Sequence, residues 1–144
     1  MRKLIYLLIL GAMFIISCGQ EGNKNEANNS ESDNNKEVKG KEIYNRICIA
    51  CHQSNGEGTP GSFPPLAKSD FLKNKDSVIA QVLNGKKGEI KVNGMVYNNV
   101  MPPMGTALKD QEVVDVINYV YASFGNDGSK VTIDQVKHIR ATVE

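Results

Sequence analysis

Five consecutive residues, Cys48-Ile49-Ala50-Cys51-His52, constrain this chain more than any other stretch. Two thiols three positions apart, directly followed by an imidazole, match the spacing by which two thioether bonds and one iron ligand hold a c-type haem. Each thiol can add to one vinyl group of the porphyrin, and a ring nitrogen of His52 can reach the iron. The motif occurs once, so we expect one covalently attached haem.

Other uses of these residues fit the sequence less well. A thioredoxin-like redox pair needs a strand before the motif, whereas a helical pattern precedes it here. A structural zinc site needs four ligands, and the remaining Cys and His residues are only Cys18 and the distant His138. A disulfide between Cys48 and Cys51 would close a very small loop and leave His52 without a role.

The N-terminus has the pattern of an export signal. Arg2 and Lys3 precede an apolar run over residues 4–16, which is too short to span a bilayer. The run ends in Ile15-Ile16-Ser17-Cys18, which resembles the lipobox of bacterial lipoproteins, where cleavage leaves an acylated N-terminal Cys. We therefore expect a signal peptide over 1–17, lipidation of Cys18, and anchoring of the exported chain to a bacterial membrane.

Residues 18–38 form a polar segment that follows the expected cleavage site. It is rich in Asn, Glu, Ser, Gly and Lys, and cannot bury enough apolar surface to offset the entropy of ordering. We interpret it as a flexible tether. The whole chain carries a net charge of +1, which becomes −1 once Arg2 and Lys3 are removed. No basic stretch with interleaved aromatic residues is present, so nucleic acid is not an expected partner.

The remaining sequence predicts helices joined by loops and one small hairpin. An apolar stripe of Val38, Ile43, Tyr44 and Ile47 indicates a helix over about 38–48, and a loop rich in Gly and Pro follows over 53–65. A second helix is expected over about 76–83, with its stop at Asn84-Gly85.

Asn93-Gly94, between two short β-forming runs, predicts a two-stranded hairpin in which Met95 packs inward or on the haem. The clearest periodicity covers 110–124, with Asp110 as the expected N-cap and Gly125 at C′. A last short helix opens at Thr132, with a capping box completed by Gln135. It should bury Ile133, Val136 and Ile139.

The second axial ligand decides what a haem protein does. A haem with one protein ligand is open to substrates, whereas a haem with two protein ligands passes electrons. Met101 and Met104 both flank Pro102-Pro103, which stiffens the loop, and a thioether stabilises ferrous iron. From the residues alone both methionines remain candidates.

The order of motifs over Lys39 to Phe124 resembles that of class I cytochromes c. The order is a helix, CxxCH, a loop with Pro64-Pro65-Leu66, a Met-Pro step and an amphipathic helix. This resemblance implies an all-α fold wrapped around one haem c, with His52 and Met101 as axial ligands and Met104 as the alternative. It also implies that the Pro64 carbonyl bonds the proximal imidazole, and that haem attachment takes place outside the cytoplasmic membrane.

Three further stretches are similar to a subgroup found beside, or fused to, bacterial nitrite reductases, dehydrogenases and oxidases. They are residues 97–103, 108–110 and 124–126. We therefore expect a respiratory reductase, dehydrogenase or terminal oxidase as the redox partner. Phe63 and Tyr97 are weaker candidates for packing on the haem.

The sequence thus predicts an all-α cytochrome c domain over 39–125, with a hairpin before the axial Met. The extension over 126–144 contains a helix that looks like an appendage, and His138 on it is expected to be a surface residue. The expected function is single-electron transfer on the periplasmic or outer side of the cytoplasmic membrane, not catalysis. The alternatives are a haem-based ligand sensor with a displaceable Met and a haem peroxidase.

Overall fold

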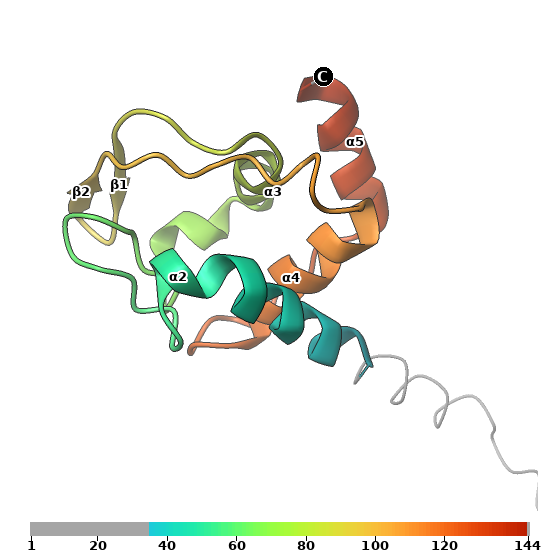
Figure 1. Cartoon of the computed structure of the whole chain (residues 1–144), viewed down its shortest axis with the longest axis horizontal. Coiled ribbons are helices and arrows are strands. Elements are labelled where there is room, and N and C mark those ends of the chain that lie inside the picture. Colours follow the sequence, from blue (N-terminus) through green and yellow to red (C-terminus); the bar gives the residue numbers. More distant parts are fainter. Residues whose placement is uncertain (1–34, 144) are drawn as a thin grey trace, which may run out of the picture.

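The computed structural model describes residues 35–143, in which helices surround a single core and a short hairpin lies at the opposite end from the last helix (Figure 1). The expected signal peptide, Cys18 and nearly all of the expected tether lie outside the described residues. Residues 35–43 are α-helical, and the named elements follow in chain order: η1 (Tyr44–Cys48), α2 (Ile49–His52), η2 (Asp70–Lys73), α3 (Lys75–Asn84), β1 (Ile90–Val92), β2 (Met95–Tyr97), α4 (Asp110–Ala122) and α5 (Ile133–Val143).

The N-terminal helix is continuous from residue 35 to His52 but changes its winding on the way. Its middle part, η1, is a π-helical turn, closed by a hydrogen bond from the Ile49 N–H to the Tyr44 carbonyl. Because a π turn holds one residue more than an α turn, the side chains after it are rotated relative to those before it. Cys48 and His52 therefore face a different part of the core from Ile43 and Tyr44.

The apolar stripe of this helix begins at Gly40 and not at Val38. Gly40, Ile43 and Tyr44 are buried, at the spacing of one helix face, whereas Val38 is 57% exposed. The expectation that Val38 is part of the stripe is wrong, because a residue two positions before Gly40 lies on the opposite side of the helix. A Cβ on Gly40 would collide with the Asp115 carbonyl oxygen and the Tyr119 Cβ of α4.

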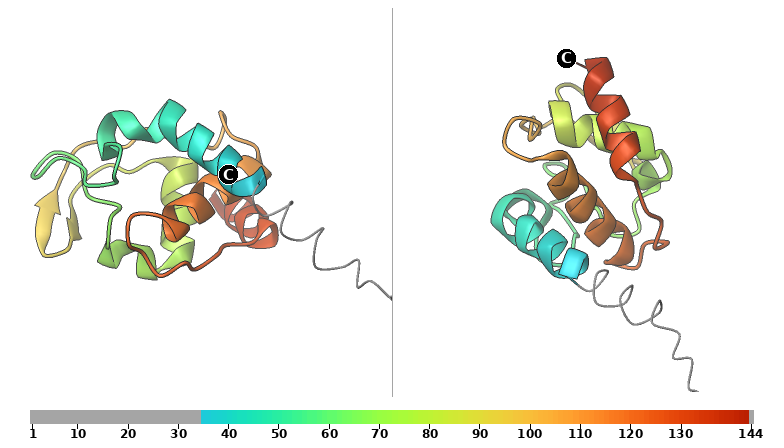
Figure 2. Two further views of the ribbon diagram at one scale, coloured as in Figure 1. Left: turned by 90° about the horizontal axis from the view of Figure 1, so that it is seen from below. Right: turned by 90° about the vertical axis from the view of Figure 1, so that its right-hand side faces the viewer.

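Helix α4 is the centre of the fold. Figure 2 shows it between the N-terminal helix on one side and α3 with α5 on the other. Seven of its residues are buried: Val113, Val114, Asp115, Val116, Ile117, Val120 and Tyr121. The Tyr121 hydroxyl donates to the Leu72 carbonyl at 2.6 Å. The rings of Tyr44, Tyr119 and Phe124 form a cluster of tilted and edge-to-face contacts, with centroids 5.3–5.8 Å apart, at the contact with the N-terminal helix.

Both expected caps of α4 are displaced by one position. The N-cap is Lys109, whose N–H donates to the Glu112 carboxylate at 2.8 Å, and Asp110 is the first helical residue. The Asp110 carboxylate is instead used by Arg140 of α5. At the other end α4 stops at Ala122, and Phe124 as well as Gly125 has a positive φ, so Gly125 is not the C′ residue.

Helix α3 and the hairpin confirm the predicted elements. The Asn74 side chain caps α3 by accepting from the Ser77 N–H at 3.0 Å, and Gly85 ends the helix with a φ of +70°. Strands β1 and β2 pair in antiparallel register through the Asn93-Gly94 turn, where both residues have the positive φ of a tight hairpin. The predicted fold class, all-α with one small hairpin, is confirmed.

Helix α5 is an integral part of the core. Its predicted capping box is present, since the Thr132 N–H donates to the Gln135 side chain at 2.9 Å and the Gln135 N–H to the Thr132 hydroxyl at 3.3 Å. Val136 is fully buried, with Ile133 and Ile139 half-buried beside it, and the helix packs on both α3 and α4. The interpretation of this helix as an appendage is therefore wrong. Within residues 35–143, no helix has both the length and the apolar character to cross a membrane.

Candidate haem site

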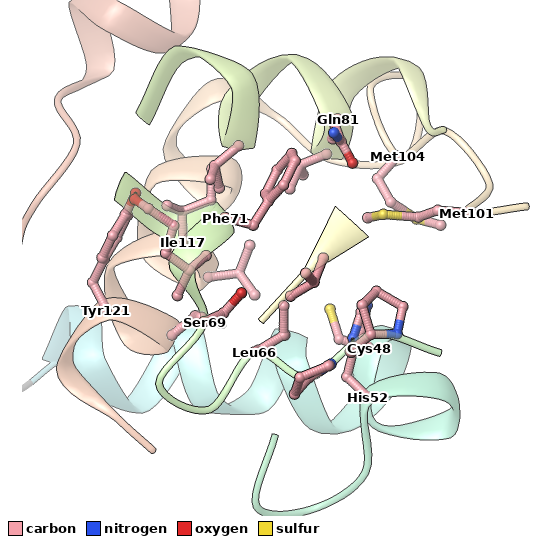
Figure 3. Close-up of a pocket in the computed structure, with 18 of the residues that line it drawn as sticks. Cys48, His52, Leu66, Ser69, Phe71, Gln81, Met101, Met104, Ile117 and Tyr121 are labelled. Carbon is pink, nitrogen blue, oxygen red and sulfur yellow. Dashed lines mark hydrogen bonds between the residues drawn. The ribbon is translucent and has the colours of Figure 1, made fainter. Parts of the chain in front are cut away.

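One cavity opens between the CxxCH helix, the two prolines after it, α3, the hairpin and α4. It holds about 850 Å³ of empty space, counting its open mouth. Its wall is almost entirely apolar. Figure 3 shows Cys48 and His52 on one side of this cavity and Met101 and Met104 on the other.

His52 is buried at 9% exposure and is oriented by one hydrogen bond. Its Nδ1 lies 2.9 Å from the Pro64 carbonyl oxygen. A carbonyl only accepts, so Nδ1 carries the proton and Nε2 keeps its lone pair. Burial lowers the pKa of His52, and the bond to Pro64 opposes this only in part, so the imidazole is neutral at neutral pH. This is the protonation state in which imidazole binds a metal.

The helix positions the two cysteines, but the cavity wall includes only one of them. Cys48 lines the cavity, whereas Cys51, one turn later, is half-buried and does not. Both thiols are free. Burial, and next the nearby Cys51, raise the pKa of the Cys48 thiol to about 11. Reactive cysteines of thioredoxin-like CxxC pairs have lowered pKa values, so this environment does not match that alternative.

Met101 and Met104 both reach the cavity, but they differ in their surroundings. The Met101 backbone is fixed by two hydrogen bonds to Lys86, N–H to carbonyl in each direction, at 2.9 and 2.8 Å. Its sulfur extends into the cavity in Figure 3, and its side chain is not packed against the buried core cluster. Met104 does pack against that cluster, and its N–H donates to the Val82 carbonyl at 2.9 Å.

The weaker candidates do not line the cavity, and their packing on the haem stays a prediction. Phe63 is half-buried and Tyr97 is buried at 5% exposure, yet neither lines the wall. Met95 is 45% exposed, so its expected inward packing is wrong.

Ser69 and Gln81 supply polar groups to the wall that were not predicted (Figure 3). Gln81 could have been found, because it follows Val78 by three positions and so interrupts the apolar face of α3. Ser69 lies in an irregular loop, where no periodicity marks it.

The residues present fit a c-type haem. The cavity is apolar, a neutral imidazole enters from one side with its Nε2 free, a thioether enters from the other, and a thiol lies in the wall beside the imidazole. Residues 35–143 contain no cluster of three or more His, Cys, Asp and Glu side chains that could hold a metal ion by themselves. A ligand set of one imidazole and one thioether binds iron only when a macrocycle supplies the remaining donors.

Comparisons with known proteins also support a c-type haem. The family model for cytochrome c matches residues 37–123. Cytochrome c-552 of Thermus thermophilus is 40% identical over 113 residues, an alignment that covers 71% of this chain and 84% of that protein.

Two further similar proteins are much longer than this chain. The fructose dehydrogenase cytochrome subunit of Gluconobacter japonicus is 30% identical over 110 residues, covering 71% of this chain and 22% of that protein. The cytochrome c subunit of a quinone alcohol dehydrogenase from Gluconacetobacter polyoxogenes is 31% identical over 109 residues, covering 73% and 23% respectively.

Proposed function

The chain belongs to the cytochrome c family, and from this premise we propose that it carries single electrons between membrane-associated redox proteins on the extracytoplasmic side of a bacterial membrane. Membership in the family implies one covalently bound haem c, and Cys48 and Cys51 occupy its attachment positions. The family consists of electron carriers, some of them subunits of dehydrogenases. The sidedness and the partner are the parts that we propose.

One observation carries the proposal: His52 and Met101 approach the same apolar cavity from opposite sides. When bound, the haem supplies an iron that changes between the ferric and ferrous states. The Pro64 carbonyl holds His52 in the tautomer that leaves Nε2 free, and the Met101 thioether favours the ferrous state. His52 and Met101 would together hold the iron, and a haem held by two residues of the chain would leave no position for a substrate.

One contrast favours Met101 over Met104 as the second ligand. Both methionines reach the cavity and both have hydrogen-bonded backbones, but only the Met101 side chain is free of the core contacts that hold Met104. A side chain that already fills a gap in the core would have to leave it in order to reach the iron.

The axial ligand is tested by the weak near-infrared band that a sulfur-to-iron bond gives in the oxidised protein. We expect Met101→Ala to abolish the band and Met104→Ala to keep it, because only the Met101 sulfur is free to bind. Met95→Ala, at an exposed position on the hairpin, is the matched control. Loss of the band in Met104→Ala with retention in Met101→Ala would reverse the assignment.

Neither alternative function gains support from the cavity. A peroxidase needs a distal acid–base group, and the described wall contains Ser69 and Gln81 but no second His, carboxylate or Arg. A ligand sensor needs a methionine that leaves easily, and the loop of Met101 is held at several points along its backbone. Electron transfer is the function that agrees with His52 and Met101 as the two iron ligands.

The partner that we propose is a respiratory oxidoreductase, with a dehydrogenase as the first choice and a nitrite reductase or terminal oxidase as the alternatives. Two similar proteins are cytochrome subunits of a fructose dehydrogenase and a quinone alcohol dehydrogenase, which supports this choice. The net charge near zero after signal removal implies weak electrostatic steering, so we expect association with the partner to depend little on ionic strength.

We also propose that Cys18 is lipidated and anchors the domain to the membrane. Acyl chains bind a bilayer with about 0.8 kcal/mol per buried CH₂, so several chains on one residue hold the protein firmly. Expressed with its native N-terminus, the protein should fractionate with membranes, and Cys18→Ala should release it with an unchanged haem spectrum. An unmodified Cys18 in the mass spectrum of the native protein would contradict the anchor.

A further inference from the structure

Arg140 of α5 joins three parts of the chain with one side chain. Its Nε donates to Asp110 Oδ1 at 2.7 Å, its Nη1 to the Gly105 carbonyl at 2.6 Å, and its Nη2 to the Leu108 carbonyl at 3.0 Å. The planar guanidinium presents its donors in a fixed fork, so the three acceptors are held in one geometry. The side chain is 22% exposed, which limits competition from water.

Two of these acceptors belong to the segment that carries the methionines. Gly105 follows Met104 directly, and Leu108 lies between it and α4. From the other side, the Met104 and Gly105 N–H groups donate to the Val82 and Leu83 carbonyls of α3, both at 2.9 Å. The segment is thus held by backbone bonds from α3 and by Arg140 from α5.

At Gly105, groups of α3 and α5 both lie close to the backbone of the segment. A Cβ at this position would lie 2.8 Å from the Leu83 carbonyl oxygen and 3.4 Å from the Arg140 Nη1. Upstream, Val100, Pro102 and Pro103 are exposed, and the Met101 backbone is hydrogen-bonded to Lys86. The loop therefore has two fixed ends, at Met101 and at 104–108, and a solvent-facing middle.

We propose that Arg140 is a positioning residue that keeps the Met101 loop closed over the cavity and so restricts displacement of Met101 by external ligands. The inference rests on the proposed function, in which Met101 is the axial ligand. Removing Met101 from the iron requires its loop to move outward, and movement of the 104–108 end breaks two charge-assisted bonds to carbonyls. Arg140 does not itself line the cavity and does not contact the proposed ligands; it reaches the wall through the Leu108 carbonyl, so it acts through the loop.

The test is the affinity of the oxidised, haem-loaded full chain for imidazole, a small ligand that competes with the Met101 sulfur. The near-infrared band reports the competition directly. Arg140→Met, which keeps the length of the side chain and removes its donors, should bind imidazole about tenfold more tightly than the native protein, a change of about 1.4 kcal/mol in binding free energy.

Two control variants distinguish the loss of the bonds to the loop from the loss of other contacts and charges of α5. Asp110→Ala removes the ion pair and leaves both carbonyl bonds, and Lys137→Met removes an exposed cation from the same helix. Both should bind imidazole as the native protein does. Arg140→Lys keeps a cation beside Asp110 but cannot bond both carbonyls at once, so we expect a smaller rise. This variant carries the test if Arg140→Met does not accumulate.

Native affinity in Arg140→Met and Arg140→Lys would overturn the inference, as would an equal rise in Asp110→Ala. These outcomes leave the proposed function intact, because the native protein would still show its band. Absence of the band in the native protein would instead refute Met101 ligation itself.

Discussion

Gly40 lies where the N-terminal helix packs tightly against α4. Helix propensity alone favours alanine over glycine by about 1 kcal/mol. The added Cβ would, however, collide with the Asp115 carbonyl oxygen and the Tyr119 Cβ, and both belong to a helix that is buried against the core. Backbone cannot move aside as cheaply as the end of a flexible side chain.

We therefore expect Gly40→Ala to lower the free energy of unfolding by about 1–3 kcal/mol, the usual cost of overpacking. Chemical denaturation of the haem-loaded protein measures it. Lys41→Ala, exposed at the next position of the same helix, should change stability by less than about 0.5 kcal/mol. An unchanged or raised stability in Gly40→Ala would mean that the two helices can separate at no cost.

At this scale the sequence predicted the residues that belong to a motif and missed those defined by their contacts. Cys48, Cys51 and His52 follow from spacing alone. The choice between Met101 and Met104 needed the resemblance, because both stand beside the same prolines. Gly40 was not singled out, since its importance comes from α4, which is some 70 positions away in the chain.

At the scale of elements, the hairpin is held to the domain by its turn. The Asp70 N–H donates to Asn93 Oδ1 at 2.9 Å, the Asn93 N–H to Asp70 Oδ1 at 2.8 Å, and the Asn93 Nδ2 to the Lys68 carbonyl at 3.3 Å. Two strands alone are marginal in water. Together with the buried side chain of Val92, these bonds hold the hairpin beside the cavity. Ile90 and Val92 form part of the cavity wall.

The variant Asn93→Gly tests the side-chain hydrogen bonds of Asn93 without changing the conformation of the turn. Glycine keeps the positive φ that the turn requires but removes the two bonds made by the Asn93 side chain. We expect amide hydrogen exchange in the hairpin to accelerate by about tenfold, in line with about 0.5–1.5 kcal/mol for each bond, while exchange in α4 stays unchanged. Lys91→Ala, exposed on β1, is the control. Native exchange rates in Asn93→Gly would show that the strands alone hold the hairpin.

Elements with strong local signals were predictable, and elements set by tertiary contacts were not. Asn93-Gly94 specified the hairpin, and the Thr132 and Gln135 spacing specified the start of α5. The N-cap of α4 was misplaced because the carboxylate of Asp110, a good cap by residue type, is bound by Arg140 instead. The π turn over Tyr44–Cys48 has no marker in the sequence that we can name.

At the scale of the whole molecule, α5 is part of the cytochrome c domain. The sequence analysis assigned 39–125 to the domain and 126–144 to an extension, since the family resemblance ends at Phe124. In the structure α5 packs on α3 and α4 and buries Val136 completely, and its Arg140 reaches the loop that carries the methionines. A resemblance cannot describe residues that it does not cover.

We propose that the chain itself fills both axial positions of its haem and is therefore an electron carrier. Carbon monoxide added to the reduced native protein tests this most directly, because it binds ferrous haem wherever a position is open. We expect an unchanged absorption spectrum, together with ready binding by Met101→Ala, which serves as the positive control. A carbon monoxide complex formed readily by the native protein would contradict the claim and favour a sensor or an enzyme.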